Sequence, residues 1–223
     1  TVVVKEEDLI TQTIEKNAAT VVRISATVGT SSPVEVFAGI GVILTPDGLL
    51  AADAASIPRD ASSLRAASVE GVSYFISPVT AEVSRGLALY RIGERAGVTA
   101  DGPTPNPKPA TLADVSSLKL GQTVIALGGR TRTSVAMGII SSLIPGSADG
   151  RETKDTPAIE RIETTLTARE IVPGTPIFNI FGELVALALS SPSDPDARRY
   201  IAPRELARAL AATSSPTTLL DTH

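Results

Sequence analysis

The chain has 223 residues, of which 43 % are hydrophobic, 20 % are charged and only 3 % are aromatic. This size suits one large domain or two closely packed halves, with a core of Val, Ile, Leu and Ala rather than aromatic rings. The net charge of −4 leaves no positive surplus for phosphates, which argues against a nucleic-acid partner. The absence of cysteine excludes disulfides and thiolate chemistry. No segment reaches the roughly 20 apolar residues that cross a bilayer, so we expect any membrane attachment to lie outside this chain.

A short helix and then a first set of strands are predicted in the N-terminal half. Residues 5–18 form the helix, because acidic side chains stand at its N-terminal end and Ile10 and Ile14 share one face. The turn Thr45-Pro46-Asp47-Gly48 lies between two apolar runs, a pattern typical of a hairpin. We therefore expect a first barrel over 20–95, with strands at 21–28, 38–44, 49–52, 72–76, 81–83 and 87–92.

A second set of strands follows a connector. Residues 96–110 are too rich in proline and glycine for a helix or a ladder and form a linker. A closing helix at 203–212 starts with Pro203 and precedes a tail at 213–223. Two strand sets separated by a linker predict two tandem β-barrels, with the second at 111–202. Its strands are expected at 123–127, 134–143, 158–165, 176–179, 184–189 and 199–201.

Five strings, in this order along the chain, resemble the HtrA/Deg branch of the trypsin-like serine proteases. The similarity spans roughly residues 6–212 and implies an all-β fold, in which two six-stranded antiparallel barrels and the terminal helices make a single domain over 1–223. The strings are Gly39–Leu50, Leu118–Gly128, Val135–Ser141, Gly174–Asn179 with the following Gly182–Val185, and Tyr200–Pro203.

The resemblance also locates the catalytic positions of the family, and each holds a residue without the required group. Ala55 stands at the histidine position, counted from the Pro-Asp-Gly turn. Gly86 stands where the aspartate precedes a Leu-Ala-hydrophobic run, and Pro173 stands at the nucleophile position. Ile171 replaces the glycine whose N–H joins the oxyanion hole, and Pro173 has no N–H to donate. We therefore predict a vacated triad and no oxyanion hole.

Two further observations do not depend on that alignment. The single histidine is the final residue, His223, and no serine occurs between Ser147 and Ser190. Removal of a complete triad lowers turnover by about 10⁶-fold. We therefore expect a pseudoprotease rather than an enzyme, with no cofactor and no metal site.

Several other residues could in principle support catalysis, and each also has an ordinary structural interpretation. The Ser116-x-x-Lys119 spacing of Ser/Lys acyl enzymes lies before a strand instead of on a helix, which favours a polar turn. Asp53 lies near the vacated histidine position, and Glu82 and Arg85 lie near the vacated aspartate position. A hydrolase with non-standard groups would pair Asp53 with a threonine hydroxyl. The threonines near the old nucleophile are Thr164, Thr165, Thr167 and Thr175.

The preferred hypothesis is an inactive module that binds a protein or an extended peptide. Proteases of this fold hold substrates as an added strand beside the second barrel, and this pairing needs no triad. The candidate groove residues are Ala186, Leu187, Ala188, Leu189 and Ser190. The rival interpretation is a purely structural domain whose cleft is filled by residues 171–173.

The resemblance further implies particular partners and a location. The partners would be an active HtrA-like paralogue or further copies in a homotrimer. The location would be extracytoplasmic, in a periplasm or at a cell surface. Because the chain begins with Thr1 instead of Met, we expect any anchor to lie upstream.

Overall fold

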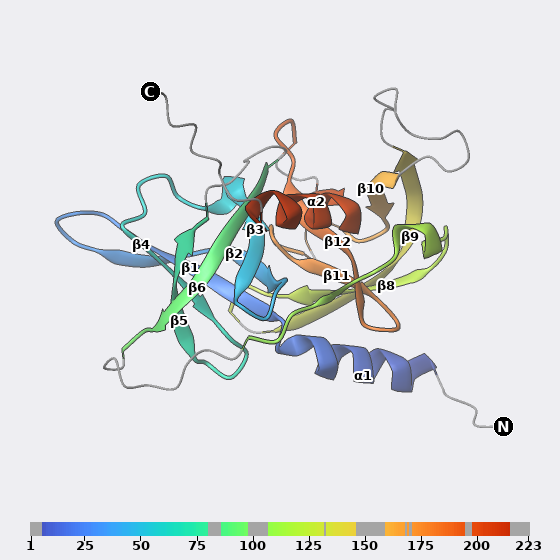
Figure 1. Cartoon of the computed structure of the whole chain (residues 1–223), viewed down its shortest axis with the longest axis horizontal. Coiled ribbons are helices and arrows are strands. Elements are labelled where there is room, and N and C mark those ends of the chain that lie inside the picture. Colours follow the sequence, from blue (N-terminus) through green and yellow to red (C-terminus); the bar gives the residue numbers. More distant parts are fainter. Residues whose placement is uncertain are drawn as a thin grey trace, which may run out of the picture.

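The computed structural model describes residues 6–79, 86–97, 107–131, 133–145, 159–167, 169, 171–194 and 198–214. Two β-barrels lie side by side, with one helix at the N-terminal end of the chain and another near its C-terminal end (Figure 1). Both barrels are closed rings of six antiparallel strands, which confirms the fold predicted from the sequence. No helix in the described ranges is long and apolar enough to span a bilayer.

The first barrel is closed in the order β1-β2-β3-β6-β5-β4. Its predicted hairpin turn is present, because Gly48 N–H donates to the Thr45 carbonyl at 3.0 Å and Leu44 N–H donates to the Leu49 carbonyl at 2.8 Å. The strands are β1 (Val21–Val28), β2 (Val34–Ile43), β3 (Leu49–Asp53), β4 (Ser63–Ala67), β5 (Ser73–Pro78) and β6 (Leu87–Arg95). A 3₁₀ turn, η1 (Ala54–Ser56), follows β3.

The second barrel is closed in the order β11-β8-β9-β10-β13-β12, with β12 pairing back to β11. A two-residue strand, β7, adds to β12 in parallel, outside the antiparallel ring. The strands are β7 (Thr111–Leu112), β8 (Thr123–Gly128), β9 (Ser134–Pro145), β10 (Ile159–Thr164), β11 (Pro176–Asn179), β12 (Glu183–Ser190) and β13 (Arg198–Ile201). The 3₁₀ turn η3 (Val115–Ser117) precedes β8.

Two strands were not predicted from the sequence. β4 has only one buried residue, Ala66, so it carries little of the apolar alternation that indicates a strand. β7 is only two residues long and directly follows the proline-rich linker. The strand predicted at 81–83 lies outside the described residues.

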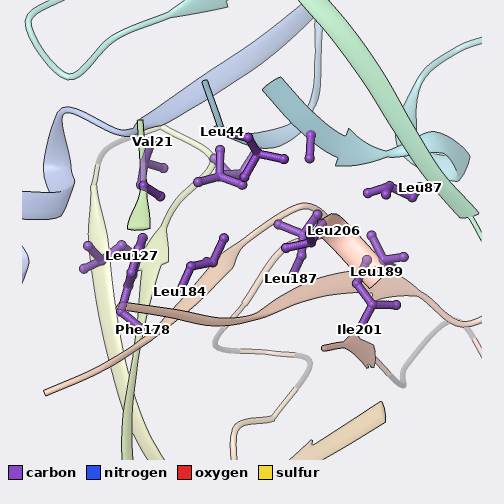
Figure 2. Packing of buried hydrophobic residues seen from close by; sticks show 14 of the residues in the cluster. Val21, Leu44, Leu87, Leu127, Phe178, Leu184, Leu187, Leu189, Ile201 and Leu206 are labelled. Atoms are coloured by element: carbon purple, nitrogen blue, oxygen red, sulfur yellow. The ribbon is translucent and has the colours of Figure 1, made fainter. Parts of the chain in front are cut away.

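Three apolar cores hold the domain together: one inside each barrel and one between them. Figure 2 shows the core between the barrels, where Leu87 of the first barrel lies on the opposite side from Leu187 and Phe178 of the second. Leu206 of α2 (Pro203–Ser214) belongs to the same core. The two barrels therefore share one buried interface.

The N-terminal helix, α1 (Glu6–Ala18), is attached to the second barrel. Its Ile10 and Ile14 pack against the core between the barrels, as expected from their shared face. The buried Thr13 hydroxyl donates to the Ile180 carbonyl at 2.8 Å, and the Asn17 amide donates to the Gly182 carbonyl at 3.2 Å. Both carbonyls lie in the turn between β11 and β12, so α1 supports one end of these strands.

Candidate functional site

The positions predicted for the catalytic histidine and aspartate lie at the ends of two paired strands. Ala55 is the middle residue of η1, directly after β3. Gly86 directly precedes β6. Because β3 and β6 pair with Asp53 opposite Leu87, the chain segments that carry Ala55 and Gly86 leave the first barrel at the same edge.

Pro173 reaches this edge from the second barrel. Its carbonyl accepts a hydrogen bond from Ile40 N–H at 3.1 Å. A side chain on Gly39 would meet the Ser56 hydroxyl at 2.8 Å and the Pro173 carbonyl at 3.2 Å. The fold thus brings η1 and the segment at Pro173 together beside Gly39, on the seam between the barrels.

Asp53 connects the two barrels at this seam. Its side chain is only 1 % exposed. One carboxylate oxygen accepts from Ser190 N–H at 3.0 Å, and the other accepts from the Ser190 hydroxyl at 2.8 Å. Burial, and secondly the charge of Asp53, raise the pKa of the nearby Tyr90 phenol above its ordinary value. Asp53 is therefore a hydrogen-bonded residue at a strand end, one of the two roles weighed for it from the sequence.

An arginine occupies the space beside Gly86. A Cβ atom placed on Gly86 would lie 2.8 Å from an Nη2 atom of Arg199, which comes from β13. The Leu189 side chain is the next neighbour, at 3.9 Å. A guanidinium group thus lies beside Gly86, the residue predicted from the resemblance to stand at the aspartate position.

The segment at the oxyanion position is folded into the domain. Ile171 is 3 % exposed and belongs to the core of the second barrel, whereas the half-buried Val172 packs against the core between the barrels. Gly174 N–H donates to the Ala188 carbonyl at 2.6 Å, and Thr175 N–H donates to the Val172 carbonyl at 3.2 Å. The two N–H groups that follow Pro173 are therefore engaged inside the protein.

Most of the predicted peptide groove is closed. Residues 186–189 are 0 % exposed. The backbone of Leu187 pairs with Pro176 of β11 on one side and with Ile201 of β13 on the other. The prediction of an open edge along Ala186, Leu187 and Ala188 was therefore wrong, because closure of the barrel gives this stretch two neighbours.

The end of β12 differs from its middle. Ala188 N–H donates to the Thr175 carbonyl, at the edge of β12 that does not face β13. The N–H and C=O groups of successive residues in a strand point alternately to its two edges. The backbone groups of Ser190 therefore face the same side as those of Ala188, toward the seam, where Asp53 accepts from the Ser190 N–H. Ser190 is half-buried and Ser191 follows it outside the strand. Of the predicted stretch, only its last residue, Ser190, is not fully buried.

Three of the other sequence candidates, Ser116, Thr164 and Thr165, make local hydrogen bonds in the structure. Ser116 donates from its N–H and its hydroxyl to the Asp114 carboxylate, at 2.9 and 2.7 Å, and these hydrogen bonds hold the pKa of Asp114 below its usual value. The Thr165 hydroxyl accepts from Ile139 N–H at 3.0 Å. Thr164 accepts from Leu166 N–H at 3.3 Å. Glu82, Arg85 and His223 lie outside the described residues.

No three His, Asp or Glu side chains gather as metal ligands within the described ranges. Sequence reasoning had flagged Asp53 but missed its partner and the guanidinium beside Gly86. The sequence signal for Asp53 was its charge at the end of an otherwise apolar strand, Leu49–Asp53. No local signal connects Arg199 with Gly86, because they meet only in the folded chain.

Comparison with known proteins agrees with this arrangement of barrels and seam. The chain belongs to the family of trypsin-like peptidase domains, whose match covers residues 36–187 and so includes Ala55, Gly86 and Pro173. No curated protein matches the chain by sequence.

Two solved structures of HtrA-type proteases have a similar fold. One is AlgW with a tripeptide, with a TM-score of 0.67 and 18 % identity over 91 % of this chain. The other is a variant of AlgW with a tripeptide, with a TM-score of 0.68 and 18 % identity over 94 % of this chain. The chain spans 62 % and 63 % of the length of these two structures. At this identity the likeness concerns the fold.

Proposed function

We propose that this domain is a catalytically inactive, HtrA-like trypsin-fold module that binds an extended segment of a protein or peptide. The observation that carries the proposal is the chemistry of the seam. Ala55, Gly86 and Pro173 hold no imidazole, carboxylate or hydroxyl at the three matching positions. The carboxylate that is present, that of Asp53, is engaged by Ser190.

Peptide hydrolysis also needs donors for the negative oxygen of the intermediate. Pro173 has no N–H, and the N–H groups of Gly174 and Thr175 already donate to backbone carbonyls. Loss of one such donor costs about 10²- to 10³-fold in turnover, in addition to the loss of the triad. Inactivity is therefore supported by two independent deficits at the same seam.

Labelling with a fluorophosphonate probe tests inactivity directly, because the probe reacts with an activated hydroxyl. We expect neither labelling of the purified protein nor cleavage of fluorogenic casein, with trypsin as the positive control. Labelling of the wild type that disappears in Thr175→Val or Asp53→Ala would contradict the proposal. It would favour a hydrolase that uses non-standard groups.

Peptide binding is supported by the position of Ser190, which ends β12 at the seam and is only half-buried. Its N–H is held by Asp53, so an added segment would pair with main-chain groups beyond that N–H. A segment laid beside Ser190 and Ser191 would add main-chain hydrogen bonds, which require no triad. The partner would be an extended peptide segment of another protein, including an active paralogue or a further copy of this chain. We also propose an extracytoplasmic location, because the chain resembles HtrA-type proteases.

A fluorescein-labelled peptide of alternating Val and Gln tests this binding by anisotropy. A version N-methylated at alternate residues keeps the side chains but removes half of the backbone donors. We expect the N-methylated peptide to bind at least tenfold more weakly. Equal affinities would argue against strand addition, and absence of binding by both peptides would favour a purely structural domain.

A further inference from the structure

A large polar cavity opens beside the end of β12, in the wall of the second barrel. It has a volume of about 770 Å³. β10 and β13 pair over only two positions, Arg161 with Ile201 and Ile162 with Tyr200. Beyond this pairing β10 continues to Thr164, while β13 begins at Arg198. The cavity lies where these two strands diverge.

The charged side chains of its wall are mostly positive. Arg161 comes from β10, and Arg198 and Arg199 come from β13, whereas Glu163 is the one acidic residue among the described residues of the lining. Arg161 and Glu163 are exposed, and the two arginines of β13 are half-buried. This excess of guanidinium groups contrasts with the net charge of −4 of the whole chain.

The arginines are held by their surroundings. The Nε atoms of Arg198 and Arg199 are buried, and both side chains make further interactions within the chain. Arg161 and Arg199 also line a smaller hollow of about 360 Å³ that contains Glu160 and Glu205. These two arginines thus line both the smaller hollow with its acidic groups and the larger cavity.

Hydroxyl groups complete the lining. Serines or threonines are contributed by β9, by the segment after β10 and by the segment after β12. Guanidinium groups bind carboxylates through paired N–H donors, and hydroxyls can donate to the remaining oxygen lone pairs. The hydroxyl-bearing residues are Ser141, Thr164, Thr167, Ser191 and Ser193.

We propose that this cavity binds a carboxylate side chain, so that the module selects extended segments that carry Asp or Glu. The inference rests on the proposed function, because Ser191 belongs both to the cavity wall and to the end of the proposed groove. Alternate side chains of an added strand point to one face. A segment beside Ser190 and Ser191 would therefore turn every second side chain to one face, and in the proposed complex that face is the side of the cavity.

The test compares the Val/Gln peptide with one in which Glu replaces each Gln. We expect the Glu peptide to bind about tenfold more tightly at low salt, an effect typical of a charge-assisted hydrogen bond, with the difference shrinking as salt rises. Arg161→Gln should abolish most of this difference. Arg59→Gln, which removes an exposed arginine from the first barrel, should preserve it. Circular dichroism confirms that both variants fold.

The outcomes separate the inference from the proposed function. Equal binding of the two peptides would overturn the carboxylate site while leaving the groove intact. If neither peptide binds, the groove is contradicted, and titration with N-acetylglutamate against N-acetylglutamine tests the cavity alone. Amide shifts at 161–167 and 190–194 that only the glutamate derivative causes, and that Arg161→Gln removes, would uphold the site. Their absence would overturn it.

Discussion

At the scale of single residues, the seam depends on a buried carboxylate. A carboxylate that leaves water needs hydrogen-bond donors, and Asp53 obtains two from Ser190. These hydrogen bonds link β3 of the first barrel to β12 of the second across 137 positions in the sequence. Asp53 is thus a polar anchor within an otherwise apolar contact between the barrels.

Replacement of Asp53 should therefore destabilise the domain. Asp53→Ala removes both acceptors and leaves the Ser190 N–H buried, so we expect a loss of about 3 kcal/mol in the free energy of unfolding. Urea denaturation followed by circular dichroism measures it. Asp60→Ala, at an exposed position, serves as the control and should change stability by less than about 0.5 kcal/mol. Equal effects of the two substitutions would refute the anchoring role.

The Tyr90 phenol makes the same region sensitive to alkaline pH. Burial first, and the charge of Asp53 second, raise its pKa above the ordinary value of 10.0. In the unfolded chain the phenol ionises near that value, whereas in the folded chain it stays protonated to higher pH. Ionisation therefore favours the unfolded state, and the stabilisation is lost as pH rises through the folded pKa.

We accordingly expect stability to decline above about pH 10, with a smaller decline in Tyr90→Phe. Stability at a series of pH values, measured by urea denaturation, provides the test. Tyr74→Phe is the matched control, because this half-buried tyrosine lies in β5 of the same barrel. A decline that is unchanged in Tyr90→Phe but reduced in Tyr74→Phe would contradict this assignment.

At the scale of elements, the approach of β11 to the first barrel requires glycine at one position. Gly174 has a φ of +83°, and a Cβ atom there would lie 1.8 Å from the Ile40 carbonyl oxygen. This distance is far shorter than any contact between a carbon and an oxygen that are not bonded. The segment can cross beside β2 only because residue 174 has no side chain.

Substitution of two glycines with nearly the same φ, Gly71 and Gly174, distinguishes the cost of backbone strain from the cost of a steric clash. Gly71 has a φ of +80°, and a Cβ atom added there would have nothing within 4 Å. We expect Gly71→Ala to cost about 1 kcal/mol from the backbone conformation alone. Gly174→Ala should cost at least about 3 kcal/mol more or prevent folding, since backbone atoms must move. Thermal and urea denaturation compare the two, and similar costs would show that the close approach is unimportant.

At the scale of the whole molecule, the third core makes the barrels one cooperative unit. Leu187 of β12 is fully buried in the core between the barrels, and Leu50 of β3 is fully buried inside the first barrel. A domain whose halves share a core of this kind should unfold in a single transition. Neither barrel would remain folded after the shared core is lost.

Leucine truncations test this cooperativity. Leu187→Ala and Leu50→Ala should each cost about 2–5 kcal/mol, and calorimetry should show one transition in both variants with equal calorimetric and van't Hoff enthalpies. Two resolved transitions in Leu187→Ala would show that the barrels are separately stable. The Leu50 variant, with the same truncation inside one barrel, controls for loss of side-chain volume.

The sequence alone was sufficient for the features that neighbouring residues encode. Strand alternation, the turn at 45–48 and the terminal helices are local, and they predicted both barrels. The same local strings predict Ala55, Gly86 and Pro173 at the three catalytic positions, and this assignment stays a prediction. β4 was missed because only Ala66 of its five residues is buried, so its local pattern was weak.

Only the tertiary structure decided which groups meet and which edges are open. Closure of the second barrel buried Ala186 to Ala188 between two strands, although their sequence alone suggested an accessible strand edge. Packing of the two barrels against each other brought Asp53 to Ser190 and placed Arg199 beside Gly86. These two contacts join residues that are more than 100 positions apart. No periodicity within a short window contains that information, because it arises only when the two barrels pack against each other.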